Sequence, residues 1–305
     1  MIKHIYIISF FLIGTSIWAQ QDPQYTQYIY TMNILNPAYV STVENTTVTS
    51  LGRSQWVGID GAPKTISFSF VTPLSRKLGL GFSVVHDEVG PIKENNVYLD
   101  LSYEIDLTEK SKLALGLKGG LTMLDINGLM YSDENFDPLD VPVSLSTANF
   151  GFGLFYYTNS YYLGLSIPNM IGSRHINKNN DFVSTSAEVK HYFAATGYVF
   201  SLSSKTKLKA STLFKFGEDS NLSTDLSANL FINNGLEFGF SHRWDASRSE
   251  SISAVFAFNL SEKFRIGYAY DYTLTRFKDF NSGSYEIILR YVFGGGVKMK
   301  SPRYF

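Results

Sequence analysis

The sequence predicts an all-β fold, a closed transmembrane antiparallel β-barrel of about fourteen strands. Apolar residues alternate with polar or small residues along most of the chain, which is the period of a β-strand. Charged residues make up only 17% of the 305 residues, against about 25% in a typical soluble domain, and aromatic residues reach 15%. Short and long connections alternate between the strands. Together these features are typical of an outer-membrane barrel.

The composition excludes several kinds of function. The 26 basic and 27 acidic side chains give a net charge of -1, so a basic surface for nucleic acid is not expected. Cysteine is absent, which excludes disulfides, thiolate metal sites, a cysteine nucleophile and a lipidated N-terminal cysteine. The sequence also shows no spacing of metal ligands. We therefore expect no metal and no cofactor.

Residues 1–19 are predicted to be a signal peptide. Lys3 and His4 form a short polar start, residues 5–13 form an apolar run, and Ala19 stands at the small-residue cleavage position. This run is too short to cross a bilayer as a helix, which needs about 20 residues. An uncleaved N-terminal anchor is the alternative. Export out of the cytoplasm agrees with an outer-membrane location.

Residues 20–45 form a segment rich in Gln, Tyr and Asn, which we call the leader. It includes Gln24, Tyr25, Tyr28, Asn36 and Pro37. One interpretation is a periplasmic extension that packs against the barrel rim or joins an aromatic girdle. The other is a docking or plug segment, since aromatic side chains with amide neighbours provide contact area and hydrogen bonds. The barrel is expected over residues 46–293, and residues 294–305 form a periplasmic tail.

Alternation defines the strands one by one. Tyr268, Tyr270 and Tyr272, for example, alternate with Gly267, Ala269 and Asp271. Alternation of this kind predicts one apolar face and one polar or small-residue face. The first and eighth segments have an ambiguous pattern. The predicted strands are 46–56, 64–72, 78–87, 95–106, 112–124, 147–157, 160–167, 186–201, 206–216, 222–232, 235–245, 251–260, 263–274 and 284–293.

The connections indicate which way the barrel stands in the membrane. They are short after even-numbered strands and longer after odd-numbered strands, and the two longest cover residues 127–146 and 168–185. Outer-membrane barrels have short periplasmic turns and long extracellular loops. We therefore expect the short connections and both termini in the periplasm.

The first long connection contains Trp56, Gly58 and Pro63, with Lys64 opening the next strand. Glycine permits tight backbone turns, and proline fixes φ before the strand. One interpretation is a well-formed turn whose tryptophan lies in the interfacial belt. The alternative is a contact for a partner protein.

Charged residues of both signs are predicted on the lumen face of the last six strands. Opposite charges close together in a partly dry lumen will pair, which stiffens a wall and does not make an ion filter of a single sign. We therefore expect an occluded lumen, with help from the leader. The alternatives are routine filling of a barrel and a lumen that grips a polar tail or the leader. The nine residues are Lys209, Lys215, Asp225, Glu237, Arg243, Arg265, Asp271, Glu286 and Arg290.

Two histidine-containing stretches raise the question of catalysis. His86, Asp87 and Glu88 are adjacent at a strand end, so alternation divides them between two faces. His242 shares the apolar face with Phe240. Neither stretch has a visible nucleophile, base and orienting group. The sequence therefore predicts no catalytic residues and no enzyme.

Several motifs resemble one family. They are residues 21–28 (Gln-Asp-Pro-Gln-Tyr-Thr-Gln-Tyr), 36–39 (Asn-Pro-Ala-Tyr), 53–58 (Arg-Ser-Gln-Trp-Val-Gly), 61–65 (Gly-Ala-Pro-Lys-Thr), 267–271 (Gly-Tyr-Ala-Tyr-Asp) and 283–287 (Gly-Ser-Tyr-Glu-Ile). With these motifs the chain resembles the PorP/SprF family of the Bacteroidetes type IX secretion system. Family members often carry His where Tyr285 stands.

The resemblance implies an outer-membrane accessory of type IX secretion, in contact with lipid and with other secretion components. Members of the SprF type are implied to bind, help export or anchor one large secreted protein, such as a gliding adhesin with a C-terminal sorting domain. Members of the PorP type are implied to be core components that contact a periplasmic ring. The barrel alone also permits a passive pore for small solutes.

Overall fold

The computed structural model describes residues 24–126, 143–171, 190–217, 222–233, 235–246 and 248–294. The predicted signal peptide, nearly all of the tail and most of the two longest loops lie outside these residues. Within the described ranges, no helix has the length and apolar character needed to cross a membrane.

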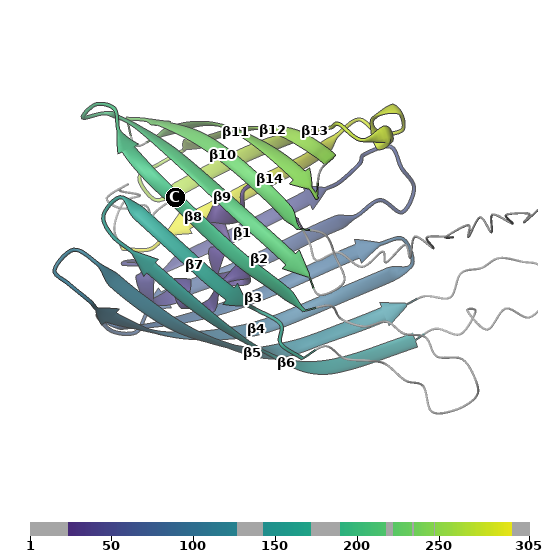
Figure 1. The fold of residues 1–305 in the computed structure, drawn as a ribbon. Helices are drawn as coiled ribbons and strands as arrows, with labels where there is room; N and C mark the ends of the chain where they lie inside the picture. Colours follow the sequence, from purple (N-terminus) through teal and green to yellow (C-terminus); the bar gives the residue numbers. More distant parts are fainter. Residues whose placement is uncertain are drawn as a thin grey trace, which may run out of the picture.

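Fourteen antiparallel strands form a closed barrel, as predicted (Figure 1). Each strand pairs with its neighbours in sequence, and β1 pairs with β14 from Thr47↔Val292 to Ser54↔Tyr285 to close the wall. The strands are β1 Thr47–Ser54, β2 Lys64–Pro73, β3 Leu78–Val89, β4 Ile92–Asp106, β5 Lys112–Ile126, β6 Val143–Tyr157, β7 Tyr161–Ile167, β8 His191–Ser201, β9 Thr206–Gly217, β10 Ser223–Ile232, β11 Leu236–Asp245, β12 Arg248–Asn259, β13 Phe264–Thr273 and β14 Ser284–Val292.

The two faces of each strand separate as the alternation predicts. On β13, Tyr268 and Tyr272 are exposed on the outer face, while Arg265, Ala269 and Asp271 are buried. Large apolar side chains such as Phe240, which is 67% exposed, cover the outside of the barrel. This apolar outer face suits contact with lipid, and the polar inner face suits a filled lumen.

The barrel has two unlike ends. We call the end that carries the connections after odd-numbered strands the loop end, and the opposite end the turn end. The connections at the turn end are short, as predicted: residues 74–77, 107–111, 158–160, 202–205, 233–235 and 260–263.

Two connections at the loop end are shorter than the sequence suggested. β3 and β4 pair up to Val89↔Ile92, so only residues 90–91 join them, and residues 246–247 join β11 to β12. In both hairpins, polar residues such as Glu88, Lys93 and Arg248 continue the ladder after the apolar alternation has stopped. The alternation therefore marks the part of each strand suited to lipid, and it underestimates the strands that continue beyond it.

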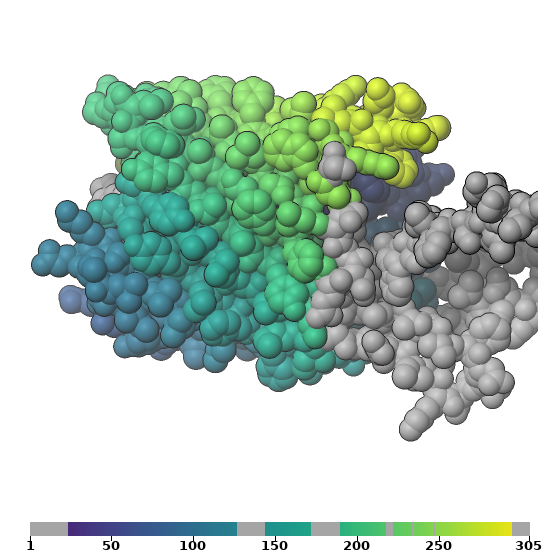
Figure 2. All heavy atoms as spheres, in the orientation of Figure 1, coloured from purple at the N-terminus to yellow at the C-terminus, as the bar shows by residue number. Residues whose placement is uncertain are grey.

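The leader lies inside the barrel and forms much of the interior core together with inward-facing strand residues. It contains a 3₁₀ turn at Tyr28–Tyr30 (η1), a short helix at Met32–Leu35 (α1) and a second 3₁₀ segment at Pro37–Thr42 (η2). Nearly all residues from Tyr25 to Val43 are buried. Figure 1 shows this segment, in purple, surrounded by the strands. In the space-filling view the strands of the near face hide it (Figure 2).

Candidate functional site

The leader runs through the lumen from one end to the other. The Gln24 side chain accepts a hydrogen bond from Arg243 Nη1 at 3.0 Å, close to the loop end of β11. Thr46 lies at the turn end, where its carbonyl accepts from the Phe293 backbone N–H at 2.8 Å. The first and last described residues, Gln24 and Gly294, are therefore at opposite ends of the barrel. The termini, predicted to share one side, lie outside the described residues.

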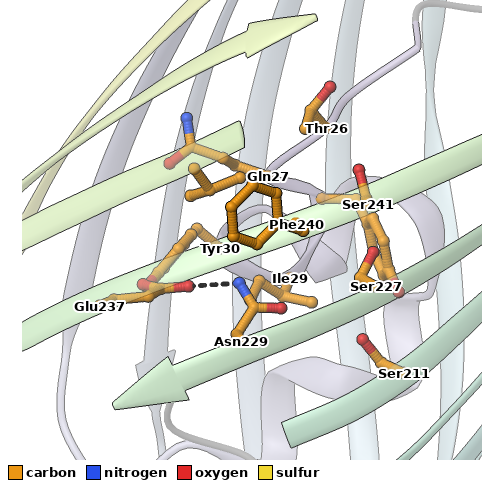
Figure 3. A pocket seen from close by; sticks show the side chains of 12 residues that line it. Thr26, Gln27, Ile29, Tyr30, Ser211, Ser227, Asn229, Glu237, Phe240 and Ser241 are labelled. Atoms are coloured by element: carbon orange, nitrogen blue, oxygen red, sulfur yellow. Dashed lines mark hydrogen bonds between the residues drawn. The ribbon is translucent and has the colours of Figure 1, made fainter. Parts of the chain in front are cut away.

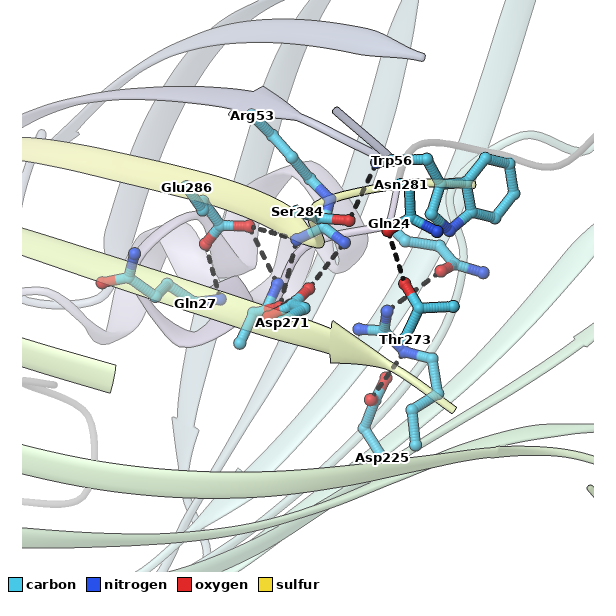
Figure 4. A network of polar contacts seen from close by, with 12 residues as sticks. Gln24, Gln27, Arg53, Trp56, Asp225, Asp271, Thr273, Asn281, Ser284 and Glu286 are labelled. Carbon is cyan, nitrogen blue, oxygen red and sulfur yellow. Dashed lines mark hydrogen bonds and ion pairs between the residues drawn. The ribbon is translucent and has the colours of Figure 1, made fainter. Parts of the chain in front are cut away.

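An arginine on β1 organises the first contact between leader and wall. Arg53 pairs with Asp271 at 2.7 Å and with Glu286 at 3.2 Å, and all three side chains are buried. Figure 4 shows these groups converging from β1, β13 and β14. Arg53 belongs to a motif that the sequence singled out, but its place in the lumen was not predicted.

The two carboxylates of this cluster also hold the leader, Glu286 by its backbone and Asp271 by a side chain. Glu286 accepts the backbone N–H of Thr26 at 3.0 Å and that of Gln27 at 2.7 Å. The Thr26 hydroxyl lies 2.8 Å from each oxygen of Asp271. A charged acceptor makes these hydrogen bonds stronger than neutral ones. Glu286 thus binds two consecutive amides through the backbone alone, and Asp271 adds a bond to a side-chain hydroxyl.

A second cluster holds Tyr30 deeper in the lumen. The Tyr30 hydroxyl donates to Glu237 and accepts from Arg265 Nε at 3.0 Å. Arg265 pairs with Glu237 at 2.7 Å, and Asn229 donates to the same carboxylate at 2.7 Å (Figure 3). Arg290 lies over the Tyr30 ring, 5.6 Å from its centroid.

The nine predicted lumen residues all lie on the inner face of β9 to β14. Arg243 pairs with Asp225 at 2.7 Å, and Lys209 lies 5.2 Å from the centroid of the Tyr162 ring. Lys215 lines a cavity beside Gln24. Most of the nine, together with Arg53, form what we call the charged wall: Arg53, Asp225, Glu237, Arg243, Arg265, Asp271 and Glu286.

The leader brings no charge into the charged wall. Residues 24–43 contain no Asp, Glu, Lys, Arg or His. The acidic and basic groups of the wall pair with one another, and the leader supplies amides, hydroxyls and tyrosine rings. Its contribution is hydrogen bonding and buried surface, with no ion pair of its own.

The opposite wall holds the leader by close approach of backbone. A Cβ atom added at Gly79 would lie 2.1 Å from the Val40 carbonyl oxygen, and one at Gly116 would lie 2.1 Å from the Ala38 nitrogen. At Gly153 it would lie 2.1 Å from the Asn36 side-chain oxygen. We call four of the inward-facing glycines of β3, β5, β6 and β7 the glycine trough: Gly79, Gly116, Gly153 and Gly164. Only residues without a side chain permit this depth of contact.

Neutral hydrogen bonds hold the leader in the trough. Asn36 Nδ2 donates to the Leu154 carbonyl at 2.9 Å, Ser166 donates to the Leu35 carbonyl at 2.7 Å, and Ser102 donates to the Ala38 carbonyl at 2.9 Å. The Asn36 side chain also accepts from the Ala38 N–H at 2.9 Å, with Pro37 at the first position of η2. Asn36 and Pro37 thus act as a helix cap inside the lumen.

The opposite wall has a charged pair that the sequence analysis missed. Lys118 lies 2.7 Å from Asp100, both side chains are fully buried, and Lys118 also donates to the Asn33 carbonyl at 3.1 Å. Lys118 on β5 and Asp100 on β4 both fall on the inward phase of their strands, which is the signal that could have identified them.

At the loop end, the β1–β2 and β13–β14 connections pack on each other. Trp56 adopts a positive φ of 46° and stacks on Phe277 with ring centroids 5.2 Å apart. The Val57 backbone exchanges two hydrogen bonds with this loop, at 2.9 and 2.7 Å. Phe277 is 50% exposed and Phe280 is 72% exposed. We call Trp56, Val57, Phe277 and Phe280 the rim platform.

The other residues predicted in this loop support its shape. Gly58 has a φ of 107° and lies beside the Phe280 backbone. Pro63 accepts a hydrogen bond from the Gln55 N–H at 2.9 Å, and Lys64 opens β2 opposite Glu88. The turn is therefore well formed, as one interpretation held. Contact with a partner remains a proposal.

The two histidines considered for catalysis face away from the lumen clusters. His86 is bound to Asn95 at 2.7 Å, and His242 packs against Trp244 with ring centroids 3.9 Å apart. Across the described ranges, no three His, Asp or Glu side chains cluster as metal ligands. The interior groups are suited to binding a polypeptide, since they bind backbone amides and tyrosine hydroxyls.

Comparison with known proteins gives one family. The family model described as type IX secretion system membrane protein PorP/SprF matches residues 17–291. No curated protein matches the sequence.

Several solved structures are similar in fold. A Pseudomonas aeruginosa FadL homologue has 10% identity and a TM-score of 0.48, covering 85% of this chain and 93% of its own. The Acinetobacter baumannii outer membrane protein Omp33 has 9% identity and a TM-score of 0.48, covering 82% and 99%. The P. putida toluene transporter TodX has 10% identity and a TM-score of 0.47, covering 84% and 92%.

Proposed function

The chain belongs to the PorP/SprF family of type IX secretion system membrane proteins, and we propose that it binds one large secreted protein and anchors it at the cell surface. Membership makes it an outer-membrane β-barrel of this secretion system. Family and fold point to a membrane component of secretion and not to an enzyme. What we propose is its role within this system, which is that of a dedicated accessory.

The observation that carries the proposal is the filled lumen. The leader crosses the interior, with Tyr28 and Tyr30 buried against one wall and Ala38 and Val40, both 0% exposed, pressed onto the other. A barrel filled in this way has no clear route for a polypeptide or for hydrated solutes. This disfavours a passive pore, and it favours a role in which the secreted protein is held at an end of the barrel.

The loop end offers the surface for this role. Phe277 and Phe280 of the rim platform are exposed apolar groups on a loop that Val57 holds through backbone hydrogen bonds with Ser282 and Gly283. Exposed aromatic groups in a polar surround are typical anchors of protein interfaces. The barrel has no energy source, so it holds a substrate that other components drive outward.

Deletion of the gene, followed by surface proteomics, tests the function. We expect one large secreted protein to disappear from the surface, and to copurify with the tagged barrel from cells that contain both. If the cell surface is unchanged and no secreted protein copurifies, the accessory role fails. Copurification of periplasmic ring components without a secreted protein would instead support a core component.

A matched pair of variants locates the surface. We expect Phe280→Ser at the loop end to reduce copurification of the secreted protein about tenfold or more, in line with the loss of an interface anchor. Leu260→Ser at the turn end, where the side chain is 56% exposed, is the control and should have no effect. Equal binding by both variants would exclude the rim platform as the site.

A further inference from the structure

We propose that the charged wall is a peptide-binding site which residues 24–30 of the leader occupy in cis, and which an uncharged segment of the secreted protein, folded in the same kind of tight turn, takes over from the loop end. We call residues 24–30 the latch and residues 36–42 the anchor. The inference rests on the proposed function, because it specifies how the barrel holds its partner. Figures 3 and 4 show the latch side chains against the wall.

The first argument is the way the wall recognises the latch. Glu286 binds two consecutive backbone amides, of Thr26 and Gln27. Every residue except proline has a backbone N–H, so this recognition does not depend on the sequence of the bound segment. Asp271 and Glu237 add acceptors for hydroxyl groups. A segment that forms a similar turn and carries hydroxyl and tyrosine side chains can satisfy the same acceptors.

The second argument is that the wall keeps its charges paired when the latch leaves. Arg53 remains with Asp271 and Glu286, Arg243 with Asp225, and Arg265 with Glu237. Removal of a bound segment is most unfavourable when it leaves a buried charge without its partner. Here the leader supplies none of the charges, so its removal leaves no charge unpaired. The complement of such a wall is an uncharged segment, which is why we assign an uncharged partner.

The third argument is that the latch can leave while the anchor stays. The anchor lies on the glycine trough, where Gly79 and Gly116 bring the backbones into contact. The latch is held by side chains of the wall and fits less completely, because both polar atoms of the buried Gln27 amide lack a hydrogen-bond partner. A small cavity lies beside it, lined by Gln27, Ser227 and Ser241 among others. The leader therefore consists of a firmly held anchor and a latch whose hydrogen bonding and packing are less complete.

The position of the latch determines the side of entry. Asp225 and Arg243 lie near the loop end of β10 and β11, and Gln24 reaches them there. An incoming segment meets this part of the wall first. The rim platform is at the same end, so a protein held by the platform has its uncharged segment beside the site.

The test uses single cysteines in the full chain, which has none of its own. Gln27→Cys reports on the latch, and this substitution breaks no hydrogen bond because the side-chain amide of Gln27 makes none. Ala38→Cys reports on the anchor and is equally buried, at 0% against 2%. In purified protein, we expect a maleimide reagent to label Gln27→Cys at least about tenfold faster than Ala38→Cys. Equal protection of both thiols would overturn the inference.

A synthetic peptide with the sequence of residues 24–30 then tests exchange. A tethered segment has an effective concentration in the millimolar range, so peptide at a few millimolar competes with the latch. We expect it to raise the labelling rate of Gln27→Cys about fivefold. The control peptide carries glutamate at the position of Thr26, which puts a carboxylate beside Asp271 and Glu286. No response to the first peptide, or an equal response to both, would overturn the inference.

A disulfide lock links exchange to the partner. Gln27→Cys with Gly267→Cys is designed to join the latch to the wall, since a Cβ at Gly267 would lie 2.4 Å from the Gln27 Oε1 atom, and loss of free thiol on oxidation verifies the lock. The control is the same double variant kept reduced, which carries the same two substitutions. Both forms should migrate as folded barrels, and we expect only the oxidised latch lock to reduce copurification of the secreted protein, about tenfold. If the unlocked barrel captures no secreted protein, the proposed function fails; if the latch lock captures it normally, only this inference fails.

Discussion

The two walls of the lumen hold the same leader by different means. The charged wall binds residues 24–30 through ion-paired side chains such as Arg53 and Glu286. The glycine trough binds residues 36–42 by backbone contact, with Gly116 against Ala38. Close backbone packing requires a segment of matching shape. Hydrogen bonds to ion-paired side chains, in contrast, can form again with another segment. One wall therefore fixes the leader, and the other wall can exchange it.

The largest expected effect is on the charged wall. Arg53→Ala leaves Asp271 and Glu286 buried without their cation, which should lower the free energy of unfolding by about 3–5 kcal/mol. Urea titration of the barrel in lipid vesicles measures it. Lys77→Ala is the control, because its pair with Asp106 is nearly half exposed and screened by solvent, so its loss should change the free energy of unfolding little. Equal losses in the two variants would mean that the Arg53 cluster is not the structural centre of this wall.

The next effect is on the trough. Gly116→Ala puts a Cβ atom 2.1 Å from the Ala38 backbone nitrogen, and overpacking of this kind should cost about 3 kcal/mol. Gly52→Ala is the control, since its Cβ would meet nothing within 4 Å. Both are measured by the same urea titration. Comparable stability of the two variants would show that the leader does not press on the trough.

A smaller effect compares one hydroxyl group at each wall. Tyr30→Phe removes the bond to the charged Glu237 and the one from Arg265, which should cost about 1.5–3 kcal/mol. Ser166→Ala removes a bond to the neutral Leu35 carbonyl, which should cost about 0.5–1.5 kcal/mol. The difference between the two free energies of unfolding sharpens the comparison. The reverse order would mean that the trough, and not the charged wall, depends on polar contacts.

Alternation predicted the strands and the inward charges of β9 to β14, but not the inward charges of Arg53, Asp100 and Lys118. Asp271 and Glu286 were placed on the lumen face because apolar residues occupy the other phase of β13 and β14. The ends of β3, β4 and β12 were missed because polar residues continue those strands at the loop end, where no apolar face is required.

The contacts of the leader could not be predicted from local pattern. Arg53 and Glu286 are 233 positions apart, and only closure of β1 on β14 brings them together. Alternation places Gly79 and Gly116 on the lumen face, but a small residue on that face does not indicate which segment packs against it. The leader has no charged residues that would indicate its partners on the ion-paired wall. Its sequence was therefore compatible both with packing at the barrel rim and with a plug in the lumen.

Single-channel recording in planar lipid bilayers tests the central claim most directly, because it asks whether the leader closes the lumen. Intact protein should show no steady open-channel current, since both walls are in contact with residues 24–43. Deletion of residues 20–30 should raise the current by removing the latch while the anchor remains in the trough. A large steady current through the intact barrel, unchanged by the deletion, would contradict the account and favour a passive pore.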